Sequence, residues 1–202
     1  MSRFTTRFGS LEDYQRGHLE IIDDEPHHYA FSNVYEVASR ARPYEKIAVG
    51  KNRQYVLEAI RAEGTSEWRT CSHDEFALVM DGEIRVELAR LGDGQQPDPE
   101  LEGSIALEGE PAGPAMGEIV ARRGHMALLP HGAAYRFHAD RPGVILLQTI
   151  EGRDTVYKWA EIVQTTNLER PSSIHAEVRA MQVDTHPPGR EPAGYPDTRR
   201  TL

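Results

Sequence analysis

The chain has 202 residues and a formal net charge of −9, with 32 acidic and 23 basic side chains. This length allows one well-buried domain with extensions. The acidic balance, with no basic stripe, argues against nucleic acid or an anionic membrane as a partner. No apolar run is long enough to span a membrane, and the N-terminus lacks the apolar core of a signal peptide. The single cysteine excludes an internal disulfide and fits a reducing, cytoplasmic location.

The first segment of the chain, residues 1–32, is polar and mixes charge with histidine. It is interpreted as an extended N-terminal arm with one short helix around Leu11–Ile22. From Ala48 onward the composition changes to β-branched and large apolar residues. Such residues favour strands, because they fit a pleated, half-buried surface.

Short strand-like runs separated by Gly or Pro turns continue to about residue 165. This spacing is typical of an all-β sandwich or barrel and not of βαβ units. Asp81-Gly82 has the composition of a two-residue hairpin turn, because glycine accepts a positive φ. The predicted strands are Tyr55–Ala62, Ser66–Cys71, Glu75–Met80, Glu83–Leu91, Glu118–Ala121, Met126–Leu129, Ala133–His138, Val144–Ile150 and Val156–Val163.

Two segments of the chain do not fit the strand pattern. Residues 92–116 form a long excursion rich in Gly, Pro and acidic residues. A loop of that length inside a compact domain is functional, disordered or docked on a partner. Residues 166–202 form a Pro-rich, polar C-terminal tail that cannot bury enough apolar area to fold alone. The sequence therefore predicts an arm (1–32), a β-barrel (33–165) and a tail (166–202).

The residues with the most chemistry lie in the segment Cys71–Gly82 and in the segment Gly124–His138. In a strand, residues of equal parity share one face, so Cys71, His73 and Glu75 lie together on the face of Ala77 and Val79. One interpretation is a hydrogen-bonded pair between His73 and Glu75 inside the barrel. Cys71 fits an inert buried thiol, because no convincing His-plus-acid arrangement accompanies it.

A metal site is the alternative. His73 and Glu75 with a third histidine would form the two-His-one-carboxylate set that binds non-haem Fe(II). The third ligand would be His125, His131 or His138, and the candidate metal set is His73, Glu75 and His138. Strand parity and turn positions do not favour any of the three histidines as the third ligand.

The two segments resemble the motifs of the cupin family, which has a double-stranded β-barrel or jelly-roll fold. Glu75 and Gly82 match the E-x6-G spacing of the first motif, and Gly124, Pro130 and Gly132 match the G-x5-P-x-G spacing of the second. The family's metal-binding histidines correspond to Arg69, Cys71 and Tyr135. The resemblance therefore implies a cupin-type barrel whose own metal site is largely lost, with barrel-pocket candidates Arg69, Cys71, His73, Glu75 and Tyr135.

A narrower resemblance extends over about residues 35 to 165. The segments Ala41–Asn52, His73–Glu83 and Arg122–Pro130 are similar to the small subunit of two-component, Fe(II)-dependent hydroquinone 1,2-dioxygenases. The resemblance implies that a large cupin subunit holds the iron and that this chain is its metal-free partner. It further implies the ring cleavage of hydroquinone or a substituted hydroquinone by O2, which gives a 4-hydroxymuconic semialdehyde. The arm, the tail and the 92–116 loop are the candidate contacts with the large subunit.

Two other functions remain open from the residues. A standalone cupin metalloenzyme with a rearranged site predicts one tightly bound divalent metal in the isolated chain. A non-catalytic cupin that binds a small ligand or serves as a structural module predicts a stable homo-oligomer without a dioxygenase partner.

Overall fold

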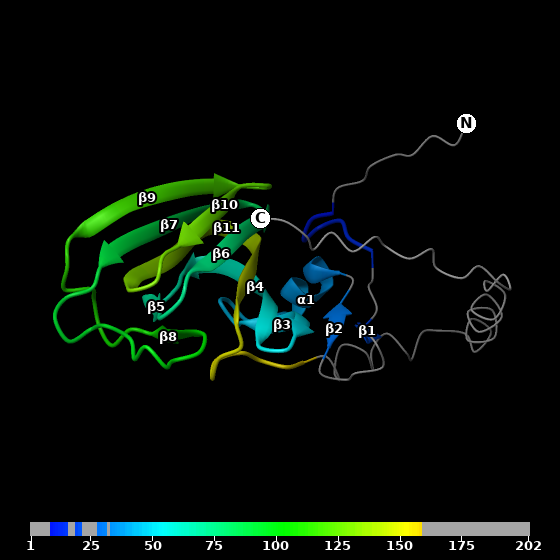
Figure 1. Ribbon diagram of the computed structural model, residues 1–202. Coiled ribbons are helices and arrows are strands. Elements are labelled where there is room, and N and C mark those ends of the chain that lie inside the picture. The colour runs from blue at the N-terminus through cyan, green and yellow to red at the C-terminus, as the bar shows by residue number, and fades with distance from the viewer. Residues whose placement is uncertain (1–8, 16–18, 22–27, 32, 159–202) are drawn as a thin grey trace, which may run out of the picture. The chain divides into compact units, whose positions relative to one another are not determined.

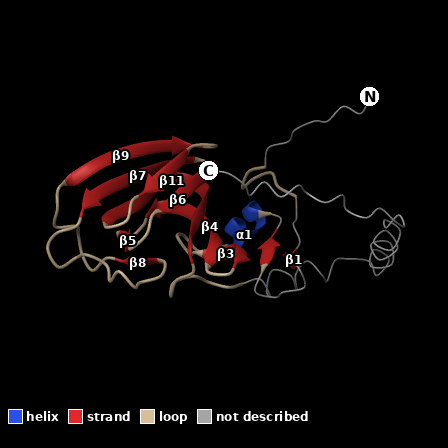
Figure 2. Cartoon of the chain, viewed as in Figure 1, coloured by secondary structure: helices blue, strands red, loops and turns tan. Residues whose placement is uncertain are grey.

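The structure is a computed structural model that describes residues 9–15, 19–21, 28–31 and 33–158. In this part of the chain, one short helix accompanies eleven strands, which confirms the predicted all-β class (Figures 1 and 2). None of the helices in the described ranges is long and apolar enough to cross a membrane. The elements are β1 (Leu19–Ile21), β2 (Tyr29–Phe31), α1 (Val34–Arg40), β3 (Ile47–Asn52), β4 (Tyr55–Thr65), β5 (Arg69–Cys71), β6 (Glu75–Asp81), β7 (Glu83–Arg90), β8 (Ser104–Ala106), β9 (Ala115–Arg122), β10 (Met126–Leu129) and β11 (Ala133–Ile150).

The sheet is organised around β11, a strand of 18 residues where the sequence predicts two separate strands. Its first half pairs antiparallel with β7 and β5, and its second half pairs with β4 and β6. The pairing with β4 shifts register between Ala139 and Gly143, where the two halves of β11 meet. One continuous strand therefore joins both halves of the barrel.

The segment Asp81-Gly82 is a corner and not the predicted hairpin turn. β6 and β7 do not pair with each other; both run along β11, each beside a different half of it. Gly82 has φ of +79°, and a Cβ placed there would lie 3.0 Å from the Cα of Gly143. The prediction was wrong because a glycine at positive φ serves a sharp corner as well as a hairpin.

The barrel core follows from the alternation of side chains along the strands. Val56, Ile60 and Ala62 of β4 are buried, as are Ile84 and Val86 of β7. These residues are among the buried apolar positions that six strands contribute to the core. Their alternation with exposed positions along each strand is visible in the sequence. The main core cluster comprises Ile60, Ala62, Ala77, Val79, Ile84, Val86, Ala121, Ala127, Leu129, Tyr135, Phe137, Ala139, Ile145 and Leu147.

The segment before β3 differs from the prediction. Leu11–Asp13 form bends, and Leu19–Ile21 is the strand β1, so the described part of the predicted helix is not helical. The helix that does form, α1, begins after Asn33, whose side chain accepts hydrogen bonds from the backbone N–H groups of Tyr35 and Glu36. Such a cap satisfies the free donors at a helix start. Val37 of α1 packs with Ile47 and Ala59 in a second apolar cluster.

The long excursion at residues 92–116 is an ordered part of the structure. It contains β8, which pairs with β5, and it leads into β9, which begins at Ala115. Gln95 receives hydrogen bonds at its side-chain oxygen from the backbone N–H groups of Gly92 and Ala112. Near the end of the described residues, Val156 forms only a bridge with Ile47. The rest of the predicted last strand and the tail, beyond residue 158, lie outside the described residues, and the proposed domain boundaries stay predictions.

Replacing Gly82 with alanine tests the corner. We expect Gly82→Ala to lower the free energy of unfolding by about 1–3 kcal/mol, because the new Cβ requires an unfavourable positive φ and meets backbone. Gly94 is the matched control, since it has φ of +81° and no atom within 4 Å of a Cβ. Urea unfolding measures both variants, and an equal loss for Gly82→Ala and Gly94→Ala would contradict the close packing of the corner.

Candidate functional site

One fully buried polar group of the barrel is the carboxylate of Glu75, at the start of β6. Its exposed fraction is 0%. The Tyr135 hydroxyl donates to Oε2 over 2.6 Å, and the Thr149 hydroxyl donates to Oε1 over 2.6 Å. Burial, followed by the nearby charge of Glu75, raises the pKa of Tyr135 well above its usual range. The phenol therefore stays protonated and keeps its role as a donor.

A second buried polar group centres on Ser104 of β8. Lys46 donates to the Ser104 hydroxyl over 2.7 Å, and the guanidinium of Arg69 donates to its hydroxyl and its carbonyl. Lys46 also lies 3.1 Å from a carboxylate oxygen of Glu58, and Arg69 forms an ion pair with Asp154. Burial raises the pKa of Glu58, and the charge of Lys46 opposes this rise. Each buried cation in this group thus has an acidic partner, as buried charges require.

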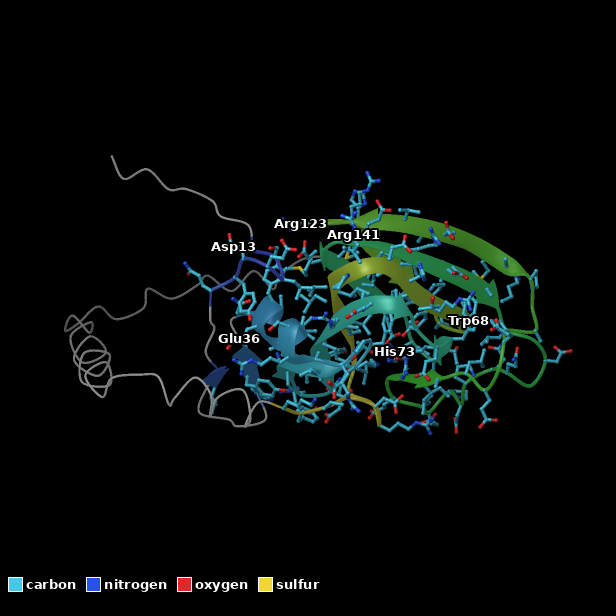
Figure 3. The ribbon with its side chains drawn as sticks, turned by 180° about the vertical axis from the view of Figure 1, so that it is seen from behind. Asp13, Glu36, Trp68, His73, Arg123 and Arg141 are labelled. Atoms are coloured by element: carbon cyan, nitrogen blue, oxygen red, sulfur yellow. The ribbon has the colours of Figure 1, made fainter. Side chains whose placement is uncertain are left out.

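Cys71, His73 and Glu75 lie together, as predicted, although they do not share one strand: β5 ends at Cys71 and β6 begins at Glu75. One potential ligand atom from each lies within 4.8 Å of those of the other two. Figure 3 shows His73, which belongs to the segment between β5 and β6. Its Nδ1 lies 3.1 Å from the carbonyl oxygen of Asp74, and its buried Nε2 has no hydrogen-bond partner among the described residues. The interpretation of His73 and Glu75 as a hydrogen-bonded pair is therefore wrong, because Tyr135 and Thr149 occupy the carboxylate.

The cluster fits a metal ion poorly, although the unpartnered Nε2 of His73 points to one available ligand. Both oxygens of Glu75 already accept short hydrogen bonds. Burial, and next the charge of Glu75, raises the pKa of Cys71 to about 12, and the thiol donates to the carbonyl of Gly103. Because metals bind the thiolate, a thiol held in its protonated form is a poor ligand.

The three histidines that could supply a third ligand lie elsewhere. His138 is hydrogen-bonded to Thr65 and Asp140, on the face opposite its buried neighbour Phe137. His131 contacts the carboxylate of Asp74, and His125 closes the turn that follows β9. His73, Glu75 and His138 therefore do not come together as a metal site. Cys71, and not His138, lies beside His73 and Glu75.

The barrel interior leaves little room for a ligand. The space next to Tyr135 holds about 20 Å³, bounded by apolar side chains such as Ile60 and Phe137 and by Lys46 and Arg69. That volume admits about one water molecule, whereas ligand pockets measure roughly 300–1,000 Å³. The space next to Tyr135 is therefore too small for an aromatic ring.

The sequence-based interpretation missed Lys46, Glu58, Ser104 and Thr149. Two of them could have been identified from the sequence. A polar residue at a position where alternation predicts a buried apolar side chain needs a hydrogen-bond partner inside the protein. Glu58 shares the parity of buried Val56 and Ile60, and Thr149 shares that of Leu147. Lys46, which precedes β3, and Ser104, which begins the three-residue strand β8, carry no such pattern.

Removing the Tyr135 hydroxyl tests the contribution of its hydrogen bond to Glu75. We expect Tyr135→Phe to lower the free energy of unfolding by about 1–3 kcal/mol, because one buried carboxylate oxygen loses its donor. In a Glu75→Gln background the same change should cost less, since an amide oxygen without a partner is cheaper than a carboxylate oxygen. Urea unfolding of the four proteins gives the coupling, and equal losses in both backgrounds would contradict the hydrogen bond's role.

Comparison with known proteins gives the family. No protein-family model matches the chain, and no curated protein matches it either. Among solved structures, hydroquinone 1,2-dioxygenase from Sphingomonas sp. TTNP3 with 4-hydroxybenzoate bound matches with 57% identity and a TM-score of 0.70, covering 79% of this chain and 96% of that one.

Hydroquinone 1,2-dioxygenase PnpCD, solved in complex with Cd²⁺ and 4-hydroxybenzonitrile, matches with 53% identity and a TM-score of 0.69, again over 79% of this chain and 96% of that one. Identity at this level over most of the chain confirms the resemblance found in the sequence, including the cupin-type fold. The chain belongs to the hydroquinone 1,2-dioxygenase family, as a subunit of a ring-cleaving dioxygenase.

Proposed function

We propose that this chain is the small, metal-free subunit of a heteromeric hydroquinone 1,2-dioxygenase. Its partner is a large cupin subunit that holds Fe(II), and its substrate is hydroquinone or a substituted hydroquinone. The observation that carries the proposal is the state of Glu75: both oxygens of the one retained cupin metal ligand accept hydrogen bonds from β11.

Two further observations favour a role for this chain as a scaffold that does not itself bind the metal or the substrate. The interior space of about 20 Å³ is too small for a hydroquinone ring. The positions that correspond to the other cupin ligands carry a buried thiol with a raised pKa (Cys71), a guanidinium in an ion pair (Arg69) and a phenol that donates to Glu75 (Tyr135). These groups hold the barrel together from inside.

In the complete enzyme, Fe(II) with open positions supplies the chemistry that brings the substrate and O2 together. The contribution of this chain is a stiff scaffold. A buried carboxylate locked by two donors, and a β11 strand that spans both halves of the barrel, keep the surface of the subunit in one conformation. A rigid neighbour of this kind can exclude water and position a partner's ligands.

The contacts with the large subunit are proposed to include the N-terminal arm, the C-terminal tail and the 92–116 loop. The loop is the part that the structure describes, and it is held by its own contacts. Trp68 donates its indole N–H to Glu110 of the loop, and Arg136 stacks on the Trp68 ring with 4.5 Å to the ring centroid. A pre-ordered loop loses little conformational entropy when it binds.

The test compares three preparations: this chain alone, the large subunit alone and the two produced together. We expect stoichiometric iron and hydroquinone-dependent O2 uptake in the pair, and neither in this chain alone. Iron is measured by elemental analysis and uptake with an oxygen electrode. A Glu75→Gln variant in the pair serves as the matched control, and it should retain iron because Glu75 binds no metal in the proposal.

Near-stoichiometric iron in the isolated chain would overturn the proposal and favour the standalone metalloenzyme. The cluster of Cys71, His73 and Glu75 would then be the site, and His73→Ala should abolish the binding. A stable homo-oligomer that neither binds a large cupin subunit nor supports uptake would instead favour the ligand-binding or structural cupin.

A further inference from the structure

The strand β9 leaves an open edge of the sheet. Among the described residues it pairs only with β7, and Figure 1 shows it as the outermost strand beside β7. Every residue of β9 except Ala121 is exposed. The exposed fractions reach 48% for Met116, 36% for Ile119 and 49% for Val120. An exposed apolar edge strand is a template for pairing with another strand.

The direction of the backbone groups shows which of them are free at this edge. The N–H of Arg90 donates to the carbonyl of Pro114, and the carbonyl of Arg90 accepts from the N–H of Gly113. Arg90 therefore directs both groups toward β9, and by alternation so do Ile84, Val86 and Leu88. Their respective register partners on β9 are Ala121, Ile119 and Gly117.

It follows that the intervening residues of β9 direct their peptide groups away from β7. These residues are Glu118, Val120 and Arg122. The peptide of Arg122 is already used, because its N–H donates to Nδ1 of His125 and its carbonyl accepts from the N–H of His125. Within the described residues, the peptide groups that remain free in the regular part of the strand are therefore those of Glu118 and Val120.

These free groups are self-complementary. Two copies of β9 that pair antiparallel across a two-fold axis must match residues of equal parity, because the axis keeps the two faces of the sheet apart. A two-fold axis at Val120 would pair Glu118 with Arg122 of the other copy, and the peptide groups of Arg122 are already hydrogen-bonded to His125. An axis at Glu118 would place two carboxylates opposite each other, which is unfavourable.

An axis at Ile119 meets neither obstacle. It places Glu118 of each copy opposite Val120 of the other, and these are the residues whose peptide groups are free. The two exposed Ile119 side chains meet at the axis on one face of the sheet, with the small residues Gly117 and Ala121 beside them. We propose that two copies of this chain pair through β9, antiparallel, with Ile119 on the two-fold axis.

This pairing goes beyond the proposed function and does not depend on it. An assembly that contains two copies of this chain would join them at β9, whether or not large subunits are present. Because the interface is isologous, it closes after two copies and does not extend into a fibre.

Cysteine cross-linking tests the register. At the axis, two Ile119 residues form a non-hydrogen-bonded pair with Cα atoms about 4.5 Å apart, within the range of a disulfide. The two Val120 residues would be diagonal neighbours about 7–8 Å apart, beyond that range. Ile119→Cys should therefore give a cross-linked dimer under mild oxidation on non-reducing gels, and Val120→Cys should not. The native Cys71 is buried, with an exposed fraction of 1%, and does not interfere.

A second experiment measures mass by light scattering. Val120→Pro removes an N–H that β7 does not use, so the fold should persist while the dimer is lost. Val120→Thr keeps both the N–H and the branched shape and should remain dimeric. The thermal midpoint of each variant checks the fold. A monomeric wild-type chain, or a Val120→Pro variant that is folded and still dimeric, would overturn the proposal.

The same cysteine variants are tested in the complex with the large subunit. Ile119→Cys should again cross-link two copies of this chain. Equal cross-linking of both variants, or none with Ile119→Cys, would show that β9 is not paired in this register. That result would leave the iron and O2 uptake test of the proposed function unaffected.

Discussion

A buried carboxylate with two hydrogen-bond donors is the interaction on which the barrel depends. Glu75 has no exposed surface, so its two oxygens need donors from the protein itself. Tyr135 and Thr149 supply them from opposite ends of the same strand, β11. This is possible because β11 changes register between Ala139 and Gly143. The change of register in β11 therefore also allows both oxygens of the Glu75 carboxylate to be hydrogen-bonded.

The bend is in turn accommodated by glycine on both sides of the contact. A Cβ at Gly82 would meet the backbone of Gly143, and a Cβ at Gly143 would lie 2.7 Å from the carbonyl oxygen of Asp81. The two corners can approach only because neither carries a side chain. β6 and β7 consequently follow the two halves of β11, and the edge strand β9 follows β7 in the same way.

The polar interior explains how a cupin-type barrel keeps a fully buried carboxylate. Losing histidines from a metal site would leave Glu75 as an isolated buried charge, which is costly. Here a phenol and a hydroxyl satisfy it, and the neighbouring cations Lys46 and Arg69 have acidic partners of their own. The interior therefore stabilises the fold, while the apolar edge at β9 and the ordered 92–116 loop are the surfaces proposed for assembly.

The sequence by itself determined the all-β class and most of the strands. These features depend on alternation along single strands, which the order of residues encodes directly. The family resemblance also came from local motifs, and the solved relatives confirm it. Tertiary structure decided the rest: that Asp81-Gly82 is a corner, that β11 is one strand, and that Tyr135 and Thr149 lock Glu75. Those features depend on which strands lie side by side, and pairing between segments far apart in the chain leaves no periodicity in either segment alone.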